Sequence, residues 1–315
     1  MPGLKALVPL DGSTLAESAF DLLPFIKTLG FDTVRLVCVW ESHWDEREVK
    51  ESGREGHVNE AAAKGRNYLG AYLDQQAERV KGMGFAVETS VRIGKAAEQT
   101  LEDATAGNAD LILIATHGRD GLARVRLGSV ADVIIRHASC PTLVIGPNVD
   151  VHMAPYSVRR ILVPLDGSAL AEEALPIAVW VAKADKAEID LVRVISLTAV
   201  TSTDPMMDVY PVDLLTAMEE GAKTYLNRIG GQIAAKVPVQ TAMLEGNAGD
   251  QLLEYLKERP AGLVVVASRG RSGILRATLG SVADRMLHGP APVLVLRPDE
   301  EIRSRLVTEA LNATA

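Results

Sequence analysis

The sequence has few aromatic residues and no long uninterrupted apolar run. Aromatic side chains make up 4% of its 315 residues, whereas hydrophobic residues make up 47% and charged residues 23%. This balance is typical of α/β proteins with cores of Ala, Val, Leu and Ile. No stretch approaches the roughly 20 apolar residues of a membrane span, and the first residues, MPGLKALVPLDGS, become polar too soon for a signal peptide. We therefore expect a cytoplasmic protein without a membrane partner.

The low cysteine count and the lack of net positive charge exclude further classes. Cys38 lies inside an apolar run and Cys140 precedes Pro141, without a CxxC or Cys/His ligand spacing, so we expect buried, reduced thiols. The six histidines show no pair at a metal-ligand spacing, and we expect no metal held by the protein alone. A formal net charge of −8 and a pI near 5.4 argue against nucleic acid as a partner. An anionic ligand would need a locally built site.

The chain contains an internal repeat. The segment ALVPLDGSTLAESAFDLLPFI, which begins at Ala6, returns as ILVPLDGSALAEEALPIAVWV from Ile161, and the segment that begins at Ala115 returns from Ala267. A repeat of this length indicates two copies of one domain, in agreement with the usual domain size of about 150 residues. We place the first domain at residues 1–147, a linker at 148–158, the second domain at 159–298 and a charged tail at 299–315.

Short β-branched runs alternate with helix-compatible segments in each copy, which is typical of parallel strands joined by crossover helices. The runs lack polar alternation because such strands are buried on both faces. We expect strands at residues 4–10, 34–40, 85–93, 110–116, 140–146, 159–165, 188–195, 237–244, 262–268 and 291–297. We expect helices near residues 14–29, 58–82, 95–106, 128–138, 169–184, 210–235, 248–258 and 280–288. The expected fold class is α/β, with two tandem doubly wound five-stranded parallel sheets, and ligands of such sheets bind where the strand order reverses.

Each copy has an aspartate at the end of its first strand. The motif VPLDGS places Asp11 and Asp166 there, just before a serine that can cap the following helix. Taken by itself the motif leaves two interpretations open. It is either part of a ligand site, or a turn that redirects the chain and caps the helix.

A second loop in each copy is suited to phosphate. The fourth strand ends in ATHG or ASRG, and after nine further residues a Gly-Ser pair opens a helix. Helix N-termini leave amide donors unpaired, so the backbone itself can hold a phosphate there. The glycines and serines that would contact the phosphates are Gly118, Gly128 and Ser129 in the first copy and Gly270, Gly280 and Ser281 in the second. Nearby positive charge comes from Arg119, Arg124, Arg271 and Arg276. The alternative is a glycine-rich turn before a capped helix, and retention of the spacing in both copies favours the phosphate site.

These motifs resemble those of the universal stress protein family, whose nucleotide-binding members carry G-x-x-G-x(9)-G-[ST] after strand four and an aspartate after strand one. The resemblance covers nearly the whole chain, twice. It implies a Rossmann-like fold and a stress-response regulatory protein. Each half would bind one adenine nucleotide, ATP or AMP, and any Mg²⁺ would arrive with that nucleotide. The residues that it places around the nucleoside are Asp11 and Asp166 at the ribose, Val39 and Val194 at the adenine through their backbone, and Pro9 and Pro164 as walls of the base.

Both halves depart from the family motif at one position, because its first glycine is Ala115 or Ala267 here. If this residue ends an extended strand with negative φ, alanine causes no backbone strain and only its methyl group approaches the ligand. If φ is positive, alanine would impair binding. We expect the change to be tolerated and keep both alanines among the ligand-contacting positions.

The resemblance also bears on assembly. Family members commonly dimerise through their fifth strands, here residues 141–146 and 292–297, and an apolar edge strand needs cover. We expect the two halves to pack as an internal pseudo-dimer, and a homodimer of chains stays open. Residues 40–57 and 196–213 follow the second strands on the ligand side of the sheet. We interpret them as ordinary loops, with ligand lids as the alternative.

Other functional classes fit the residues less well. Asp11 or Asp166 beside a phosphate could support slow ATP hydrolysis or autophosphorylation, but neither is paired with an orienting group as an activated base would be. An ATP-cleaving ligase or pyrophosphatase typically carries an SGGxDS or HIGH-type motif, and this chain has VPLDGS instead. A flavodoxin-like or receiver-like module would need a Ser/Thr-rich loop or an acidic pair there. A ligand-free interaction protein stays open.

Overall fold

The computed structural model describes residues 3–41, 55–116, 127–150, 156–196, 211–268 and 279–297, except the side chains of residues 55–62 and 211–214. The chain forms two units, one made mainly of residues up to 147 and the other mainly of residues from 157 onward. The expected linker at 148–158 lies partly outside the described residues, and the expected tail at 299–315 lies wholly outside them.

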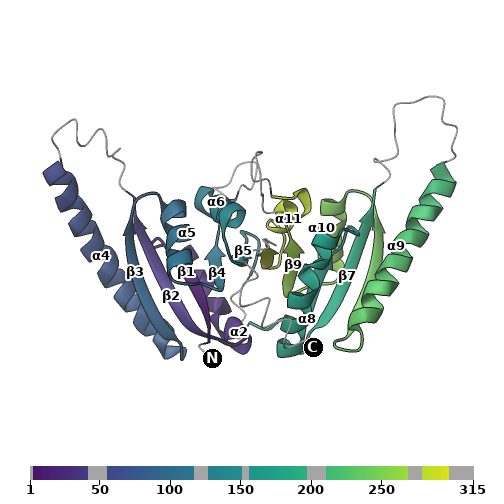
Figure 1. The fold of residues 1–315 in the computed structure, drawn as a ribbon, viewed down its shortest axis with the longest axis horizontal. Helices are drawn as coiled ribbons and strands as arrows, with labels where there is room; N and C mark the ends of the chain where they lie inside the picture. Colours follow the sequence, from purple (N-terminus) through teal and green to yellow (C-terminus); the bar gives the residue numbers. More distant parts are fainter. Residues whose placement is uncertain are drawn as a thin grey trace, which may run out of the picture. The chain divides into compact units, whose positions relative to one another are not determined.

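The first unit contains five parallel strands in the order β3-β2-β1-β4-β5. The strands are β1 (Leu4–Leu10), β2 (Phe31–Trp40), β3 (Ala86–Ile93), β4 (Leu111–Ala115) and β5 (Thr142–Ile145). The helices are α1 (Thr14–Glu17), η1 (Ser18–Leu22), α2 (Leu23–Thr28), α4 (Glu55–Gly82), α5 (Ala96–Ala106) and α6 (Ser129–His137). Figure 1 shows α4 and α5 on opposite sides of the part of the sheet that β2 and β3 form. The expected doubly wound arrangement is confirmed.

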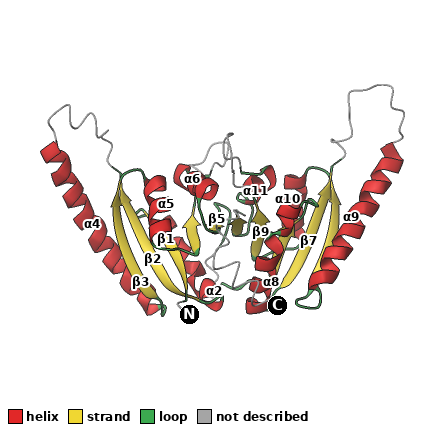
Figure 2. Cartoon of the chain, viewed as in Figure 1, coloured by secondary structure: helices red, strands yellow, loops and turns green. Residues whose placement is uncertain are grey.

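The second unit repeats this topology, with parallel strands in the order β8-β7-β6-β9-β10. The strands are β6 (Arg160–Pro164), β7 (Glu188–Ile195), β8 (Val239–Glu245), β9 (Leu263–Ala267) and β10 (Val293–Leu296). The helices are α7 (Ala169–Glu172), α8 (Ala174–Asp185), α9 (Pro211–Ile233), α10 (Ala248–Glu258) and α11 (Ser281–Met286). In Figure 2 helices flank the strands of this unit on both sides, as in the first.

The central strands are buried along most of their length. In β4 and β9 the first four residues are buried and only the last is partly exposed, and every residue of β5 and β10 is buried. Helices on both faces cause this burial, which is why these strands read as continuous apolar runs. Cys38 and Cys140 are free and buried, at 1% and 5% exposure, as expected. Among the described residues, no helix is long and apolar enough to span a bilayer.

The first helix expected in each half is broken, which corrects the sequence-based expectation. Residues 14–29 form α1, η1 and α2 rather than one helix, and Pro24 lies in the first turn of α2. In the second half α7 ends at Glu172 and α8 begins at Ala174, with Pro176 in its first turn. Proline lacks an N–H and is accommodated at the start of a helix, so the chain restarts a helix at each of these points.

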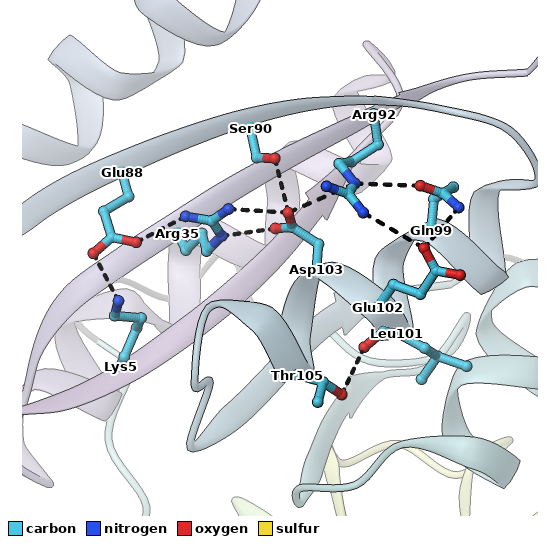
Figure 3. Close-up of polar contacts among 10 residues, drawn as sticks. All are labelled: Lys5, Arg35, Glu88, Ser90, Arg92, Gln99, Leu101, Glu102, Asp103 and Thr105. Carbon is cyan, nitrogen blue, oxygen red and sulfur yellow. Dashed lines mark hydrogen bonds and ion pairs between the residues drawn. The ribbon is translucent and has the colours of Figure 1, made fainter.

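A network of charged and polar side chains links the sheet to α5 in the first unit (Figure 3). Arg35 on β2 donates two hydrogen bonds to Asp103 on α5, Nε to Oδ2 at 2.7 Å and Nη2 to Oδ1 at 2.9 Å. Ser90 Oγ donates to the same carboxylate at 2.8 Å. Arg35 also donates to Glu88 at 2.9 Å, and Lys5 donates to Glu88 at 2.7 Å. Because Asp103 is only 1% exposed, these bonds satisfy a buried charge and fix α5 against the sheet.

Candidate functional site

The strand order of each sheet reverses between two neighbours that pair over only part of their length, and we call the place between their carboxyl ends the crevice. In the first unit β1 and β4 are neighbours, and their pairing covers only Ala6 with Leu111 and Leu7 with Ile112. Both strands continue further, β1 to residue 10 and β4 to residue 115, so their carboxyl ends separate. The pairing of β6 with β9 is equally short. Such switch points are where doubly wound sheets bind ligands.

The Asp11 loop lies at one side of the first crevice. The exposed Asp11 carboxylate accepts from the Ser13 backbone N–H at 2.9 Å and from its hydroxyl at 2.6 Å, both through Oδ1. Gly12 adopts φ +85°, a conformation that favours glycine in the turn. Ser13 then caps α1 by accepting from the Ala16 N–H at 3.1 Å. The Asp-Gly-Ser segment is therefore an ordered turn, and within the described residues the Asp11 Oδ2 atom has no hydrogen bond.

The second half builds the same turn. Asp166 accepts from the Ser168 N–H at 2.9 Å, Gly167 has φ +91°, and Ser168 caps α7 by accepting from the Ala171 N–H at 3.2 Å. Burial by itself would raise the pKa of the Asp166 carboxyl, but hydrogen bonds from Ser168 and the positive charge of Arg193 hold this pKa below its ordinary value. Asp166 is therefore ionised at neutral pH.

The second strand of each sheet extends past the first. The last pair between β1 and β2 joins Leu10 to Cys38, so Val39 has backbone without a partner on the β1 side. In the second half the last pair joins Pro164 to Val192, and Val194 lies in the corresponding overhang. On their other edges Val39 and Val194 pair with β3 and β8. Backbone groups at both expected adenine positions thus face the crevice side of the sheet.

The two prolines occupy the part of their strands that has only one neighbour. Pro9 pairs with Val37 on β2, beyond the last residue of β1 that pairs with β4, and Pro164 occupies the same place in β6. A strand position without a partner on one edge tolerates the missing N–H of proline. Both side chains are partly exposed at the crevice end of the strand.

A hydroxyl at the end of β4 holds the start of α6. Thr116, the residue after β4, is 3% exposed and its Oγ1 accepts from the backbone N–H of Gly128 at 3.0 Å. Gly128 is the N-cap of α6, which begins at Ser129. This bond places the first turn of α6 beside the carboxyl end of β4. The exposed Ser129 hydroxyl and the first-turn amides lie at this end of the helix.

Ser268 has the same role in the second half. It follows β9, is 5% exposed, and its Oγ accepts from the Gly280 N–H at 3.4 Å, a longer bond than in the first half. Gly280 is the N-cap of α11, which begins at the exposed Ser281. The expectation that each Gly-Ser pair opens a helix is confirmed. The contribution of Thr116 and Ser268 was not expected from the sequence, although the hydroxyl recurs at this position in both copies.

The alanines that replace the first glycine of the family motif sit in extended backbone. Ala115 is the last residue of β4 and pairs with Ile145, and Ala267 is the last residue of β9 and pairs with Leu296. Neither belongs to the residues with positive φ. Alanine therefore causes no backbone strain at either position, which is the favourable case.

Several expected site residues lie outside the described part of the chain. They are Gly118, Arg119, Arg124, Gly270, Arg271 and Arg276, together with most of the segments 40–57 and 196–213 that were interpreted as loops. The described residues bring together the ends of β1, β2 and β4 and the start of α6, and the equivalent elements of the second unit. Fold and site thus define a tandem α/β protein with one crevice per sheet.

Comparison with known proteins assigns the family. The model of the universal stress protein family matches residues 4–146 and again residues 157–297. The chain belongs to the universal stress protein family and contains two of its domains in tandem.

Individual relatives agree with this assignment. A universal stress protein of Mycobacterium tuberculosis strain H37Rv is 31% identical over 192 residues, which cover 60% of this chain and 62% of that protein, less than two thirds of its length. One from Mycolicibacterium smegmatis is 30% identical over 218 residues, covering 68% of this chain and 70% of that protein. The crystal structure of a universal stress protein from Archaeoglobus fulgidus covers 93% of this chain and 98% of its own, with a TM-score of 0.67 at 19% identity, and shows the shared fold.

Proposed function

We propose that each half of this universal stress protein binds one adenine nucleotide, ATP or AMP, at its switch-point crevice, and that the protein is a regulatory module of the stress response. One observation carries the proposal. In both halves a buried hydroxyl, Thr116 or Ser268, holds the N-cap glycine of a helix at the carboxyl end of the fourth strand, and the helix that follows the Asp-Gly-Ser turn contacts the same strand. The same hydrogen bond is thus formed in both halves, by a threonine in one and a serine in the other.

The Gly-Ser end of the crevice is suited to phosphate. A Cβ atom added to Gly280 would meet no described atom within 4 Å, and one added to Gly128 would meet only Thr116 Oγ1, at 3.2 Å. The glycines thus leave room for an anion to approach the main chain, where first-turn amides supply donors. In α6, which has nine residues, the helix dipole adds to these donors.

The other end of the crevice is suited to a nucleoside. The overhanging backbone at Val39 and Val194 offers donors and acceptors that can read the edge of a purine. The Asp11 and Asp166 carboxylates each use Oδ1 within their own turn. Their second oxygens are suited to accept hydrogen bonds from the ribose hydroxyls. A ligand that uses both ends must carry a nucleoside as well as a phosphate, which favours a nucleotide over inorganic phosphate.

Mass spectrometry of small molecules released on denaturing the purified protein tests this proposal. We expect AMP or ATP in the released fraction. Calorimetry with Mg²⁺ should then give two adenine nucleotides per chain and weaker binding of GTP, because the base meets a fixed backbone pattern. Equal affinity for ATP and GTP would show that the site binds the phosphates without recognising the base. Absence of any nucleotide binding would identify a ligand-free interaction protein.

A further inference from the structure

The side chain behind the aspartate turn differs between the two halves. Asp11 and Asp166 are 155 residues apart, and so are Cys38 and Arg193. Cys38 and Arg193 therefore occupy the same position of the repeat, next to Val39 and Val194 at the ends of β2 and β7. One half has a buried thiol where the other has a guanidinium.

The guanidinium of Arg193 lies beside Gly167, where no described residue of the first half occupies the equivalent place beside Gly12. A Cβ atom added to Gly167 would lie 3.1 Å from Arg193 Nη1, 3.2 Å from Nη2 and 3.3 Å from Cζ. The equivalent Gly12 has nearly the same φ, yet no described atom lies within 4 Å of its added Cβ. The guanidinium thus lies directly against the turn that presents Asp166, and its charge lowers the pKa of that carboxyl.

Neighbouring side chains hold Arg193 in this place. Its Cζ lies 4.9 Å from the centre of the Tyr225 ring on α9, and Arg228 lies over the same ring at 5.3 Å. Arg228 is in turn paired with Glu172 on α7 at 3.2 Å. The guanidinium is therefore packed on an aromatic face rather than extended into solvent.

In the first half a cation also pairs with the glutamate of this framework, Arg79 with Glu17 at 2.9 Å, but the position of Arg193 carries a thiol. Tyr72 on α4 donates its hydroxyl to Glu17 at 3.0 Å, in the place that Tyr225 and Glu172 occupy in the second half. Cys38 is 1% exposed, and burial followed by the charge of Asp11 raises its pKa to about 12. The thiol is neutral at physiological pH, so positions 38 and 193 differ by one full positive charge.

We infer that Arg193 makes the second crevice the tighter of two unequal nucleotide sites, an inference that rests on the proposed function. An anionic nucleotide that enters the first crevice meets the carboxylate of Asp11 without compensation from position 38. In the second crevice Arg193 offsets the charge of Asp166 and attracts the phosphates. For charges separated by several ångströms at a partly solvated site, this difference corresponds to roughly a three- to tenfold difference in Kd at about 0.1 M salt.

The test uses full-length chains with one working site each. Gly128→Val leaves only the second site and Gly280→Val leaves only the first, and calorimetry measures adenosine, AMP and ATP binding to both. The second site should bind ATP roughly three- to tenfold more tightly, with a smaller advantage for AMP and none for adenosine. In the Gly128→Val chain, Arg193→Met should remove the advantage, whereas Arg193→Lys should keep most of it. Raising the salt to about 0.5 M should shrink the advantage, because surface charges are screened.

The outcomes separate this inference from the proposed function. Equal Kd values at the two sites, or an unchanged ATP affinity in the folded Arg193→Met chain, would overturn the role of Arg193 while leaving nucleotide binding intact. An advantage of the same size for adenosine as for ATP would also overturn it, since packing rather than charge would then set the affinity. If neither site binds any of the three ligands, the proposed function itself is wrong. Circular dichroism of each variant checks that its secondary structure is retained.

Discussion

Arg35 on β2 and Asp103 on α5 form an ion pair joined by two hydrogen bonds. The position on β7 that corresponds to Arg35 carries an acid instead of a base. Asp190 stands 155 residues after Arg35, is fully buried, and accepts from Tyr255 of α10 at 2.8 Å and from Arg259 at 3.1 Å. The buried carboxylate has thus moved from the helix to the strand: Tyr255 stands at the helix position of Asp103, 152 residues further on, and the cation is Arg259 just after α10. Each arrangement satisfies its buried carboxylate, so the repeat has kept the contact while changing the residues that make it.

Replacing Arg35 should destabilise the first half strongly. Arg35→Met leaves the Asp103 carboxylate buried without its main partner, and we expect a loss of about 3–5 kcal/mol in unfolding free energy. Hydrogen exchange of the β2 and α5 amides measures this loss, with β7 and α10 as an internal reference. As a control, Lys81→Met at the exposed Lys81–Glu78 pair should cost less than about 1 kcal/mol. A similarly small loss for Arg35→Met would contradict a structural role of the pair.

The same carboxylate predicts how stability depends on pH. Burial by itself would raise the pKa of Asp103, but the hydrogen bonds from Arg35 and Ser90 hold it below its ordinary value. Because the folded pKa lies below the unfolded value of about 3.9, the carboxylate stabilises the fold above that pH and loses this contribution as the pH falls through its folded pKa. Urea midpoints measured from pH 7 to pH 3 should therefore decline at the acid end. Asp103→Asn should flatten that decline, and an identical decline in both proteins would assign it to other groups.

The Thr116 hydroxyl should be needed for the start of α6. Thr116→Val keeps the shape of the side chain but leaves the Gly128 amide without its acceptor, and we expect about 1 kcal/mol of lost stability together with weaker nucleotide binding in the first half. Thr116→Ser is the matched control, because Ser268 makes the equivalent bond in the second half. Calorimetry on the Gly280→Val chain isolates the first site. Equal affinities for the Val and Ser variants would show that the bond does not position the site.

Substitution of the N-cap glycines should change the stoichiometry. Gly280 has negative φ and no described atom lies within 4 Å of a Cβ added to it, so Gly280→Val should fold normally and remove one of two nucleotides per chain. Gly128→Val should remove the other, with some added strain from the 3.2 Å approach to Thr116. Calorimetric titration counts the sites. Two nucleotides bound to the Gly280→Val chain would mean that phosphate does not approach this glycine.

The expected pairing of the halves through their fifth strands stays a prediction. In a parallel strand the amides alternate between the two edges, and β5 and β10 pair with β4 and β9 along one edge. If the other edge is also paired, all amides of residues 142–145 and 293–296 should exchange slowly. Residue-resolved hydrogen exchange by NMR measures this. Fast exchange at alternate residues of both strands would exclude the internal pseudo-dimer.

Much of the fold could be predicted locally. The bounds of β1 and β7 match the expected strands, because apolar and β-branched residues dominate both segments. The expectation failed at the first helix of each half, where Pro24 and Pro176 interrupt an otherwise helical pattern. In the site, the Asp-Gly-Ser and Gly-Ser segments could be found because their turns and caps have local residue requirements.

The sequence by itself determined that this protein has two copies of one α/β domain and that each carries an aspartate turn and a Gly-Ser helix start. These features depend on repeat length, strand patterning and local backbone chemistry. Only the tertiary structure decided that β1 and β4 pair over just two residues each and that Thr116 and Ser268 hold the glycine amides. It also decided that Arg193 lies against the Asp166 turn, whereas no described atom lies at the equivalent place beside Gly12. These relationships depend on strand order and register, which bring residues far apart in the chain to one edge of a sheet. Local sequence patterns do not specify them.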